Sequence, residues 1–449
     1  MKLGAFFHPT GNHVAAWLHP GSDVDAGTNF EHYVRLAQTA ERGRFDLMFL
    51  ADSAATREGD PRSLRRWPQY MVFFDPLTLL AGLAAVTKHI GLVATATTSY
   101  NEPYNLARRL ASIDHMSHGR SGWNVVTSSN AAEALNFGRD EHFEHAERYE
   151  RAVEFVEVVR GLMDSWDDDA FPRDRETAIY FDPDKLHTLS HRGKHFTVRG
   201  PLNTARPPQG FPVIAQATQS GRGMDIAAEM AEILFTPLSN LDQAKAFYAD
   251  IKGRAVAKGR SAEDLKVMPG LNPIVAGTEK EAEARRAELA ALIHDDVGRT
   301  MLFTAMGDFD LSAYPADEPL PEEALEIGLA SGRGEAKIVA DLTRRGMTLR
   351  QVYQQYASAR GQNSIVGTPE QIADHMEAWF QARGVDGFLI QPSVLPLDLD
   401  IFVDTVIPEL QARGLFRTEY EGETLRENLG LARPASRYAR EAAPALVEG

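Results

Sequence analysis

The feature that most constrains the fold of this chain is a repeat in which a short apolar run is followed by a segment with helical spacing. The apolar runs are predicted to be strands, and they fall at residues 3–7, 45–50, 90–93, 121–130, 212–215, 233–235, 266–275 and 387–391. Apolar strands that alternate with helices are typical of a parallel sheet covered by helices on both faces. Eight such units predict an α/β fold, a closed TIM-type (β/α)8 barrel.

Two segments do not follow this repeat and are predicted to be insertions. One lies at about 165–210 and is rich in Asp, Pro and His, and the other, at about 297–363, separates the seventh and eighth units. Barrels of this kind often run long as one unit. We therefore expect residues 1–432 to form a single barrel domain with these insertions, followed by a C-terminal tail at 433–449.

Charge and composition exclude several classes of function. The 47 basic and 63 acidic residues give a net charge of −16, which argues against nucleic acids and anionic membranes as partners. The chain has no cysteine, so disulfides, thiolate nucleophiles and cysteine-based zinc sites are excluded. It contains no apolar run of about 18 residues, and its first residues resemble a strand more than a signal peptide. We expect a cytoplasmic protein.

Polar residues at the ends of predicted strands indicate where the active site lies. The stretch SGWNVVTSSN at 121–130 turns polar where a core strand would stay apolar. In TIM-type barrels the active site is built at the carboxyl ends of the strands. Residues in this position are therefore candidates for the site, and they include Asp52, Thr98, Asn124 and Gln216.

The segment AQATQSGRG at 215–223 is a candidate anion site. A predicted strand runs into a turn rich in Ser and Gly that opens a helix at Ser220 and Gly221. Free backbone N–H groups and the helix dipole favour a phosphate there, and glycine permits close approach. The alternative is an ordinary helix capped by Ser220. The segment is not a dinucleotide fingerprint, because the third glycine is missing.

Histidines provide further candidates. His145 and Tyr149 are four residues apart and share one helical face, where they are suited to hold phosphate or ribityl oxygens. The alternative is a surface ion pair with a packed aromatic. His8 and His13 follow the first strand and are candidates for acid–base catalysis, although loop histidines are more often simply exposed.

We predict no metal site in this chain. Three histidines at 187, 191 and 195 have the spacing of a helical metal-binding face, but the residues around them indicate a loop and a hairpin. The sequence also contains no His-Glu-x-x-His motif, no P-loop and no Gly-x-Ser-x-Gly motif.

Six blocks of sequence resemble one known family. They are FFHPTGNHVAAWLHP at 6–20, RSGWNVVTSSNAAEALNFG at 120–138, HAERYERAVEFVEVV at 145–159, GPLNTARPPQGFPVIAQATQSGRG at 200–223, VGTPEQIADHMEAWF at 366–380 and FVDTVIPELQARGLFRTEYEGETLRENLGL at 402–431. They are similar to the bacterial-luciferase-like flavin-dependent monooxygenases. The resemblance is to the branch with nitrilotriacetate, EDTA and dibenzothiophene-sulfone monooxygenases and the long-chain alkane monooxygenase, and it covers nearly the whole chain.

The resemblance implies an activity and partners. It implies a barrel that binds reduced FMN (FMNH2) at its carboxyl face, where O2 forms a C4a-(hydro)peroxyflavin that oxygenates a small organic substrate, typically with cleavage of a C–N or C–S bond. A separate NAD(P)H:flavin reductase would supply the FMNH2. Relatives form dimers or tetramers, so we expect a homodimer or homotetramer. Two alternatives stay open: a deazaflavin-dependent dehydrogenase of the same fold, and a non-catalytic flavin-binding protein.

The resemblance also implies roles for individual residues. Asp52 and Thr98 match strand ends that contact the flavin, and Asn124 matches a residue near the isoalloxazine. The residues that match positions holding the ribityl phosphate are His145, Tyr149 and Ser220. Alkane monooxygenases of this branch carry a catalytic histidine shortly after the Trp-Asn motif, where this chain has Thr-Ser-Ser at 127–129. His13 and His8 are then the nearest candidates for the catalytic base.

Overall fold

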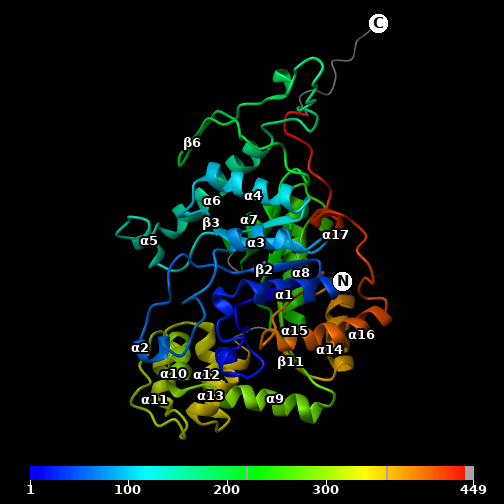
Figure 1. The fold of residues 1–449 in the computed structure, drawn as a ribbon. Helices are drawn as coiled ribbons and strands as arrows, with labels where there is room; N and C mark the ends of the chain where they lie inside the picture. The colour runs from blue at the N-terminus through cyan, green and yellow to red at the C-terminus, as the bar shows by residue number, and fades with distance from the viewer. Residues whose placement is uncertain (219–220, 360–362, 440–449) are drawn as a thin grey trace.

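The computed structural model describes residues 1–218, 221–359 and 363–439. Ten strands form one sheet in which every ladder is parallel (Figure 1). The strands are β1 (Lys2–Phe7), β2 (Leu47–Leu50), β3 (Gly91–Thr97), β4 (Ser121–Val126), β7 (Val213–Ala217), β8 (Ile233–Phe235), β9 (Lys266–Val267), β10 (Gly270–Val275), β11 (Asn363–Gly367) and β12 (Gly387–Ile390).

The segment from β9 to β10 closes the sheet into a barrel. β9 pairs with β8, and β10 pairs with β12 on the opposite side of the sheet. Between the two pieces, the Leu389 N–H donates to the carbonyl of Pro269 over 2.9 Å. The predicted α/β barrel is confirmed, with two local differences. Met268 and Pro269 divide the strand predicted at 266–275, and β11 adds a strand beside β10 that the sequence analysis does not predict.

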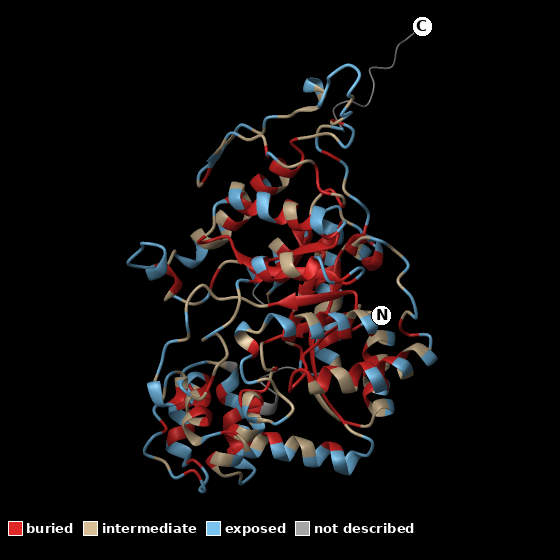
Figure 2. Ribbon diagram, in the orientation of Figure 1, coloured by how far each residue is buried: buried red, intermediate tan, exposed pale blue. Residues whose placement is uncertain are grey.

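The strands of the barrel are almost entirely buried on both faces (Figure 2), whereas β11 is only partly buried. This burial explains why the barrel strands are mainly apolar before their carboxyl ends. Alternate residues pack inside the barrel, where the Phe6 ring lies 5.3 Å from that of Phe49 and 5.8 Å from that of Phe235. The intervening residues, such as Met48 and Leu50, pack against the surrounding helices. The side chains of the barrel strands are therefore enclosed whether they point into the barrel or toward the helices.

Helices follow the strands and cover the barrel. They are α1 (Phe30–Arg42), α3 (Pro76–Ala84), α4 (Pro103–Met116), α6 (His145–Met163), α7 (Gly221–Met230), α8 (Leu241–Ala257), α9 (Glu279–Ala291), α14 (Pro369–Gln381), α15 (Leu397–Ile401) and α16 (Ile407–Ala412). Shorter helices are α2 (Pro61–Leu64), α5 (Glu133–Asn136) and α17 (Leu425–Leu429). In the described part of the chain, no helix combines the length and apolarity needed to cross a membrane.

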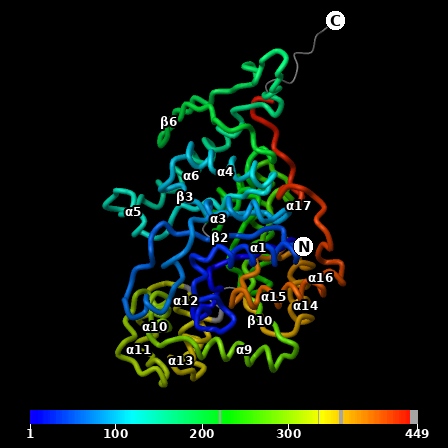
Figure 3. Tube along the Cα trace, viewed as in Figure 1, coloured from blue at the N-terminus to red at the C-terminus, as the bar shows by residue number. Residues whose placement is uncertain are grey.

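The segments at 165–210 and 297–363 leave the barrel at opposite ends (Figure 3). The first is mainly irregular and contains an antiparallel pair, β5 (His191–Arg192) and β6 (Thr197–Val198). Arg206 of this segment forms an ion pair with Asp164 over 3.0 Å, which fixes the segment to the end of α6. Arg433 pairs with Asp168 over 2.6 Å, so the chain after the last helix packs against this segment. The boundaries of the single predicted domain stay a prediction.

The second segment contains four helices that the sequence analysis does not predict. They are α10 (Asp295–Ala305), α11 (Glu322–Ala330), α12 (Gly334–Arg344) and α13 (Leu349–Ala359). These helices enclose an apolar core of their own, with Leu302, Val339 and Val352 fully buried. Val14 and Trp67, from loops of the barrel, belong to the same core. The helices are thereby fixed against the barrel near the loops that follow β1 and β2.

Candidate active site

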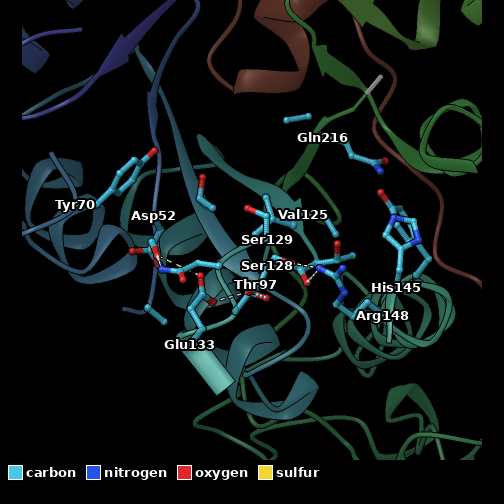
Figure 4. A pocket seen from close by; sticks show the side chains of 18 of the residues that line it. Asp52, Tyr70, Thr97, Val125, Ser128, Ser129, Glu133, His145, Arg148 and Gln216 are labelled. Carbon is cyan, nitrogen blue, oxygen red and sulfur yellow. Dashed lines mark hydrogen bonds between the residues drawn. The ribbon is translucent and has the colours of Figure 1, made fainter. Parts of the chain in front are cut away.

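A cavity of about 560 Å³ opens at the carboxyl ends of the strands β2, β3, β4 and β7 (Figure 4). The register brings these ends together, because Thr95 lies beside Asn124 and Val125 lies beside Gln216. The first turn of α6 forms another wall. The lining residues include Asp52, Ser53, Arg57, Tyr70, Thr95, Thr97, Val125, Ser128, Glu133, His145, Arg148, Tyr149 and Gln216.

Two strand-end amides predicted from the sequence lie in or beneath this cavity. Gln216 lines it and is 7% exposed, and its Oε1 has no hydrogen-bond partner among the described residues. Asn124 is not among the lining residues, but its Nδ2 donates over 2.8 Å to Oγ1 of Thr95, which lines the cavity. A buried acceptor without a donor is costly. Gln216 therefore suits a ligand that presents an N–H or O–H group at the floor of the cavity.

The first turn of α6 makes one end of the cavity basic. His145, Arg148 and Tyr149 all line it, and the rings of His145 and Tyr149 are 4.8 Å apart. Arg148 donates from Nη1 to the carbonyl of Ser128, while its buried Nε has no partner in the part of the chain described. A guanidinium at a helix N-terminus is suited to a phosphate.

Arg148 was not predicted from the sequence. It lies three residues after His145 and one before Tyr149, so the helical spacing used for that pair would also have found it. The predicted anion turn at the start of α7 is only partly visible. Gly221 begins α7, and a side chain there would meet nothing within 4 Å, whereas Ser220 lies outside the described residues.

Two carboxylates lie near the opposite side of the cavity. Burial, followed by the charges of Asp75 and Glu133, raises the pKa of Asp52 to about 6, against the opposing effect of the Ser53 N–H. Glu133, which the sequence analysis does not single out, is 4% exposed and accepts hydrogen bonds from Ser53 Oγ at 3.2 Å and Ser128 Oγ at 2.6 Å. Asp52 is thus able to exchange a proton with a ligand near neutral pH.

The other predicted residues lie elsewhere. Thr98 is fully buried, and its hydroxyl donates to the carbonyl of Val126 over 3.2 Å. His13 lines a separate cavity of about 260 Å³, and its Nδ1 accepts from the Ala15 N–H over 3.3 Å. His8 lines this smaller cavity too, and its ring makes edge contacts with Phe6 at 5.1 Å and Tyr70 at 5.5 Å.

A second large cavity, of about 450 Å³, adjoins the first. Arg57 and Tyr70 line both cavities, so the two meet at these side chains. The second cavity lies between the mouth of the barrel and the helices α10, α12 and α13. Its other lining residues are Phe6, His8, Asn12, Trp67, Gln69, Phe235, Met301, Thr304, Ala305, Arg333, Glu335, Tyr356 and Gln391. The lining combines aromatic rings with polar and charged side chains, so it suits a small organic molecule that carries polar groups.

The three histidines at 187, 191 and 195 each face a carboxylate. His187 lies 3.0 Å from Asp167, and His191 lies 3.0 Å from Glu154. Over the described ranges, no three His, Cys, Asp or Glu side chains are grouped so that they could hold a metal ion.

Comparison with known proteins identifies the family. The family described as Luciferase-like monooxygenase matches residues 5–387. The chain is 49% identical to N-acetyl-S-(2-succino)cysteine monooxygenase of Bacillus subtilis (strain 168), over 98% of both chains. It is 48% identical to nitrilotriacetate monooxygenase component A of Aminobacter aminovorans, again over 98% of both. The crystal structure of DmoA from Hyphomicrobium sulfonivorans has a TM-score of 0.86 and 32% identity, covering 100% of this chain and 96% of the other.

The chain belongs to the luciferase-like monooxygenase family and is a flavin-dependent monooxygenase. The predicted reaction class, a two-component monooxygenase that acts on a small organic substrate, is confirmed. The larger cavity fits a flavin nucleotide, because it offers a basic end at Arg148 and, at Gln216, an amide oxygen with no partner among the described residues. The alternatives of a deazaflavin-dependent dehydrogenase and a non-catalytic flavin-binding protein do not match these relatives, whose names are those of monooxygenases.

Proposed function

We propose that the 560 Å³ cavity binds reduced FMN and that the adjoining 450 Å³ cavity holds the substrate. The observation that carries this proposal is the meeting of the two cavities at Arg57 and Tyr70, which brings a substrate next to the flavin. His145, Arg148 and Tyr149 would hold the phosphate, with the start of α7 and Ser220 completing the site.

The residues of the first cavity would position the flavin and control its protons. Bound reduced FMN supplies the two electrons with which O2 is activated. Gln216 Oε1 would accept a hydrogen bond from the ring system, and Asp52, with its pKa near neutrality, would donate or accept a proton there. The aromatic residues of the second cavity, Phe6 and Phe235, would exclude water from the reaction.

We propose a substrate with a C–N or C–S bond. Nitrilotriacetate is an amine and N-acetyl-S-(2-succino)cysteine is a thioether, and the two relatives are named for these compounds. Insertion of one oxygen atom into a C–H bond beside the nitrogen or sulfur gives an unstable carbinol, which breaks the C–N or C–S bond. The second oxygen atom leaves as water, and reduced FMN is oxidised.

We also propose that a separate NAD(P)H:flavin reductase supplies the reduced FMN. The relative from Aminobacter aminovorans is named as component A, in agreement with a second component. The sequence has no complete Gly-x-Gly-x-x-Gly in a βαβ unit with an acidic residue downstream. The homodimer or homotetramer and the cytoplasmic location stay predictions.

Reconstitution with an unrelated reductase tests the proposed function. The purified chain with FMN, NADH and O2 should consume little NADH and form no product from an amine or thioether substrate. Addition of an unrelated NADH:FMN reductase should start product formation, because free reduced FMN diffuses between the enzymes. Stoichiometric NADH oxidation by this chain alone, in a preparation shown to be free of reductase, would overturn the proposal.

A further inference from the structure

Arg57 lies where the 560 Å³ and 450 Å³ cavities meet, and it lines both of them. Its guanidinium carbon is 3.7 Å from the centre of the Trp67 ring and 5.8 Å from that of Tyr70. Its Nη2 makes a long hydrogen bond of 3.5 Å to Gln69 Oε1. Its Nε is buried and has no partner among the described residues. The stacked ring planes thus hold the guanidinium in place and leave donors available.

Arg57 has no acidic partner within the described part of the chain. No carboxylate oxygen there lies within 4.0 Å of its nitrogens, although burial lowers the pKa of its guanidinium. Other arginines of this region are neutralised: Arg333 pairs with Asp308 at 3.3 Å, and Arg350 pairs with Asp317 at 2.8 Å. A partly buried guanidinium remains charged at neutral pH, and burial without a counter-charge is costly.

The rest of the second cavity suits the body of an organic molecule with one hydrogen-bond donor. Phe6, Phe235 and Met301 form its apolar part. Arg333 and the exposed Glu335 also line the cavity and contribute one charge of each sign. Gln391, at the end of β12, is 1% exposed, and its Oε1 has no partner within the described ranges. That oxygen can accept a hydrogen bond only if the ligand brings an N–H or O–H group.

We propose that the second cavity binds a small organic carboxylate, whose anionic group pairs with Arg57 and whose N–H or O–H group donates to Gln391. This inference rests on the proposed function, because it names the substrate class of the same site. The planar guanidinium favours a bidentate pair with a carboxylate over contact with a neutral group. Neutral hydrocarbons and sulfones would leave the half-buried Arg57 without a counter-charge from the described residues, so the site disfavours them.

The phosphate of FMN does not take this role in the proposed arrangement. Tyr70, over which Arg57 lies, is on the opposite side of the first cavity from His145 and Arg148 (Figure 4). Each end therefore has its own anion-binding group. Arg148 would bind the phosphate of the cofactor, and Arg57 would bind the carboxylate of the substrate. This separation makes the two roles distinguishable by experiment.

Matched pairs of acids and amides test the proposal. The probes are N-acetylglycine, N-acetylmethionine and N-acetylphenylalanine, each with its primary amide, which keeps the shape and removes the charge. Binding to the full chain is measured by calorimetric titration. At least one acid should bind the parent about tenfold or more tightly than its amide, as expected for a charge-assisted pair. If no acid is preferred over its amide, the proposal is wrong.

Variants then assign the preference to Arg57. Arg57→Gln should abolish the preference for the acid, and Arg57→Lys should keep part of it, because charge remains without the bidentate geometry. Arg62→Gln is the matched control, since Arg62 lies on the adjoining helix α2 with its side chain 72% exposed, and it should leave the preference unchanged. An unchanged preference in Arg57→Gln would overturn the proposal.

Reduced-FMN binding and thermal unfolding of the same variants separate this role from others. Arg57→Gln should bind reduced FMN as the parent does, and an equal loss of FMN and acid binding would instead place Arg57 on the flavin. If Arg57→Gln does not fold, Arg57→Lys replaces it as the test. An undiminished preference for the acid over its amide in Arg57→Lys would contradict a bidentate pair between Arg57 and the carboxylate. Failure of the carboxylate assignment would leave reductase-dependent turnover of a neutral substrate intact, whereas failure of the proposed function would abolish it with every substrate.

Discussion

The hydroxyl of Ser128 lies 2.6 Å from Glu133 Oε2 and 2.7 Å from Thr97 Oγ1, so a row of hydrogen bonds links three residues that line the larger cavity. A carboxylate can only accept hydrogen bonds, so the Ser128 hydroxyl donates to Glu133 and the Thr97 hydroxyl donates to Ser128. Thr97 Oγ1 in turn accepts from the Ser99 N–H over 3.1 Å. Ser128 has a φ of 57°, a left-handed conformation that few side chains adopt, and these bonds hold it there.

The hydrogen bonds to Glu133 give the first prediction, which concerns stability. Glu133→Ala removes the carboxylate that accepts from the buried Ser128 hydroxyl and from the half-buried Ser53 hydroxyl. We expect the free energy of unfolding to fall by about 1–3 kcal/mol, because the buried Ser128 hydroxyl loses its charged acceptor, whereas Ser53 can still donate to the carbonyl of Ala55. Urea denaturation measures it. Glu141→Ala, at an exposed position nearby, should change stability little. Equal stability of the two variants would contradict the prediction.

The second prediction concerns the pH dependence of Asp52. The folded protein raises the pKa of this carboxyl from 3.8 to about 6, so folding favours the protonated form. Its contribution to stability is therefore present at low pH and is lost as the pH rises from about 4 to about 6. Asp52→Asn cannot ionise, so relative to the parent it should gain about 1–2 kcal/mol across this range, allowing for partial solvent screening.

Urea denaturation of the parent and Asp52→Asn at pH 4 and pH 7.5 measures this difference. The variant should also turn over more slowly with reductase. The turnover of the parent should show an inflection near pH 6, and that of the variant should not. A parent and variant whose stabilities change in parallel between the two pH values would show that the pKa of Asp52 is not raised. Full activity of Asp52→Ala would remove this residue from the site.

The third prediction concerns the phosphate end of the cavity. Arg148→Gln should weaken binding of reduced FMN about tenfold or more, because it removes a charge-assisted contact. Binding of reduced riboflavin, which lacks the phosphate, should change little. Anaerobic fluorescence titration compares the two ligands. Arg109→Gln, which removes the same charge from the exposed surface of α4, is the control. Equal losses for FMN and riboflavin would mean that Arg148 supports the fold and not the phosphate.

The fourth prediction extends the phosphate site to the turn before α7. Ser220→Asp should weaken reduced-FMN binding much more than Ser220→Ala, because a second negative charge would face the phosphate at a helix N-terminus. The same titration measures both variants. Parent-like binding in both would place the phosphate elsewhere.

The barrel itself was predictable, because burial on both faces makes every barrel strand an apolar run that the sequence displays directly. Strand ends then predicted Asp52 and Gln216, whose polar side chains interrupt such runs. The helices α10–α13 were not predicted, although Val297, Met301 and Ala305 repeat at four-residue intervals and are buried. Their core forms against loop residues of the barrel, a long-range contact that local spacing does not reveal.

The charged residues of the site were harder to predict. Glu133 follows the polar end of β4, in a stretch where a charged residue would ordinarily face solvent, and only the fold turns it inward onto two serines. Arg57 likewise stands in a loop, and its position over Trp67 depends on the chain folding back ten residues later. Local sequence shows neither the burial of Glu133 nor the fact that Arg57 has no acidic partner among the described residues.

The fifth prediction separates the two loop histidines. His8 lines the proposed substrate cavity and contacts Tyr70, which borders both large cavities, whereas His13 lines only the smaller cavity among the major ones described. A histidine near the substrate can move a proton during oxygenation, and its loss should leave oxidation of reduced flavin by O2 intact while the oxygen is released as hydrogen peroxide. His8→Ala should therefore lower the ratio of product to peroxide severalfold.

His13→Ala should lower this ratio less, since the Nδ1 of His13 accepts a hydrogen bond from Ala15 and orders the loop. Reductase-coupled assays that quantify product and peroxide together decide between them, and a parent-like ratio in His8→Ala would exclude His8 from proton transfer.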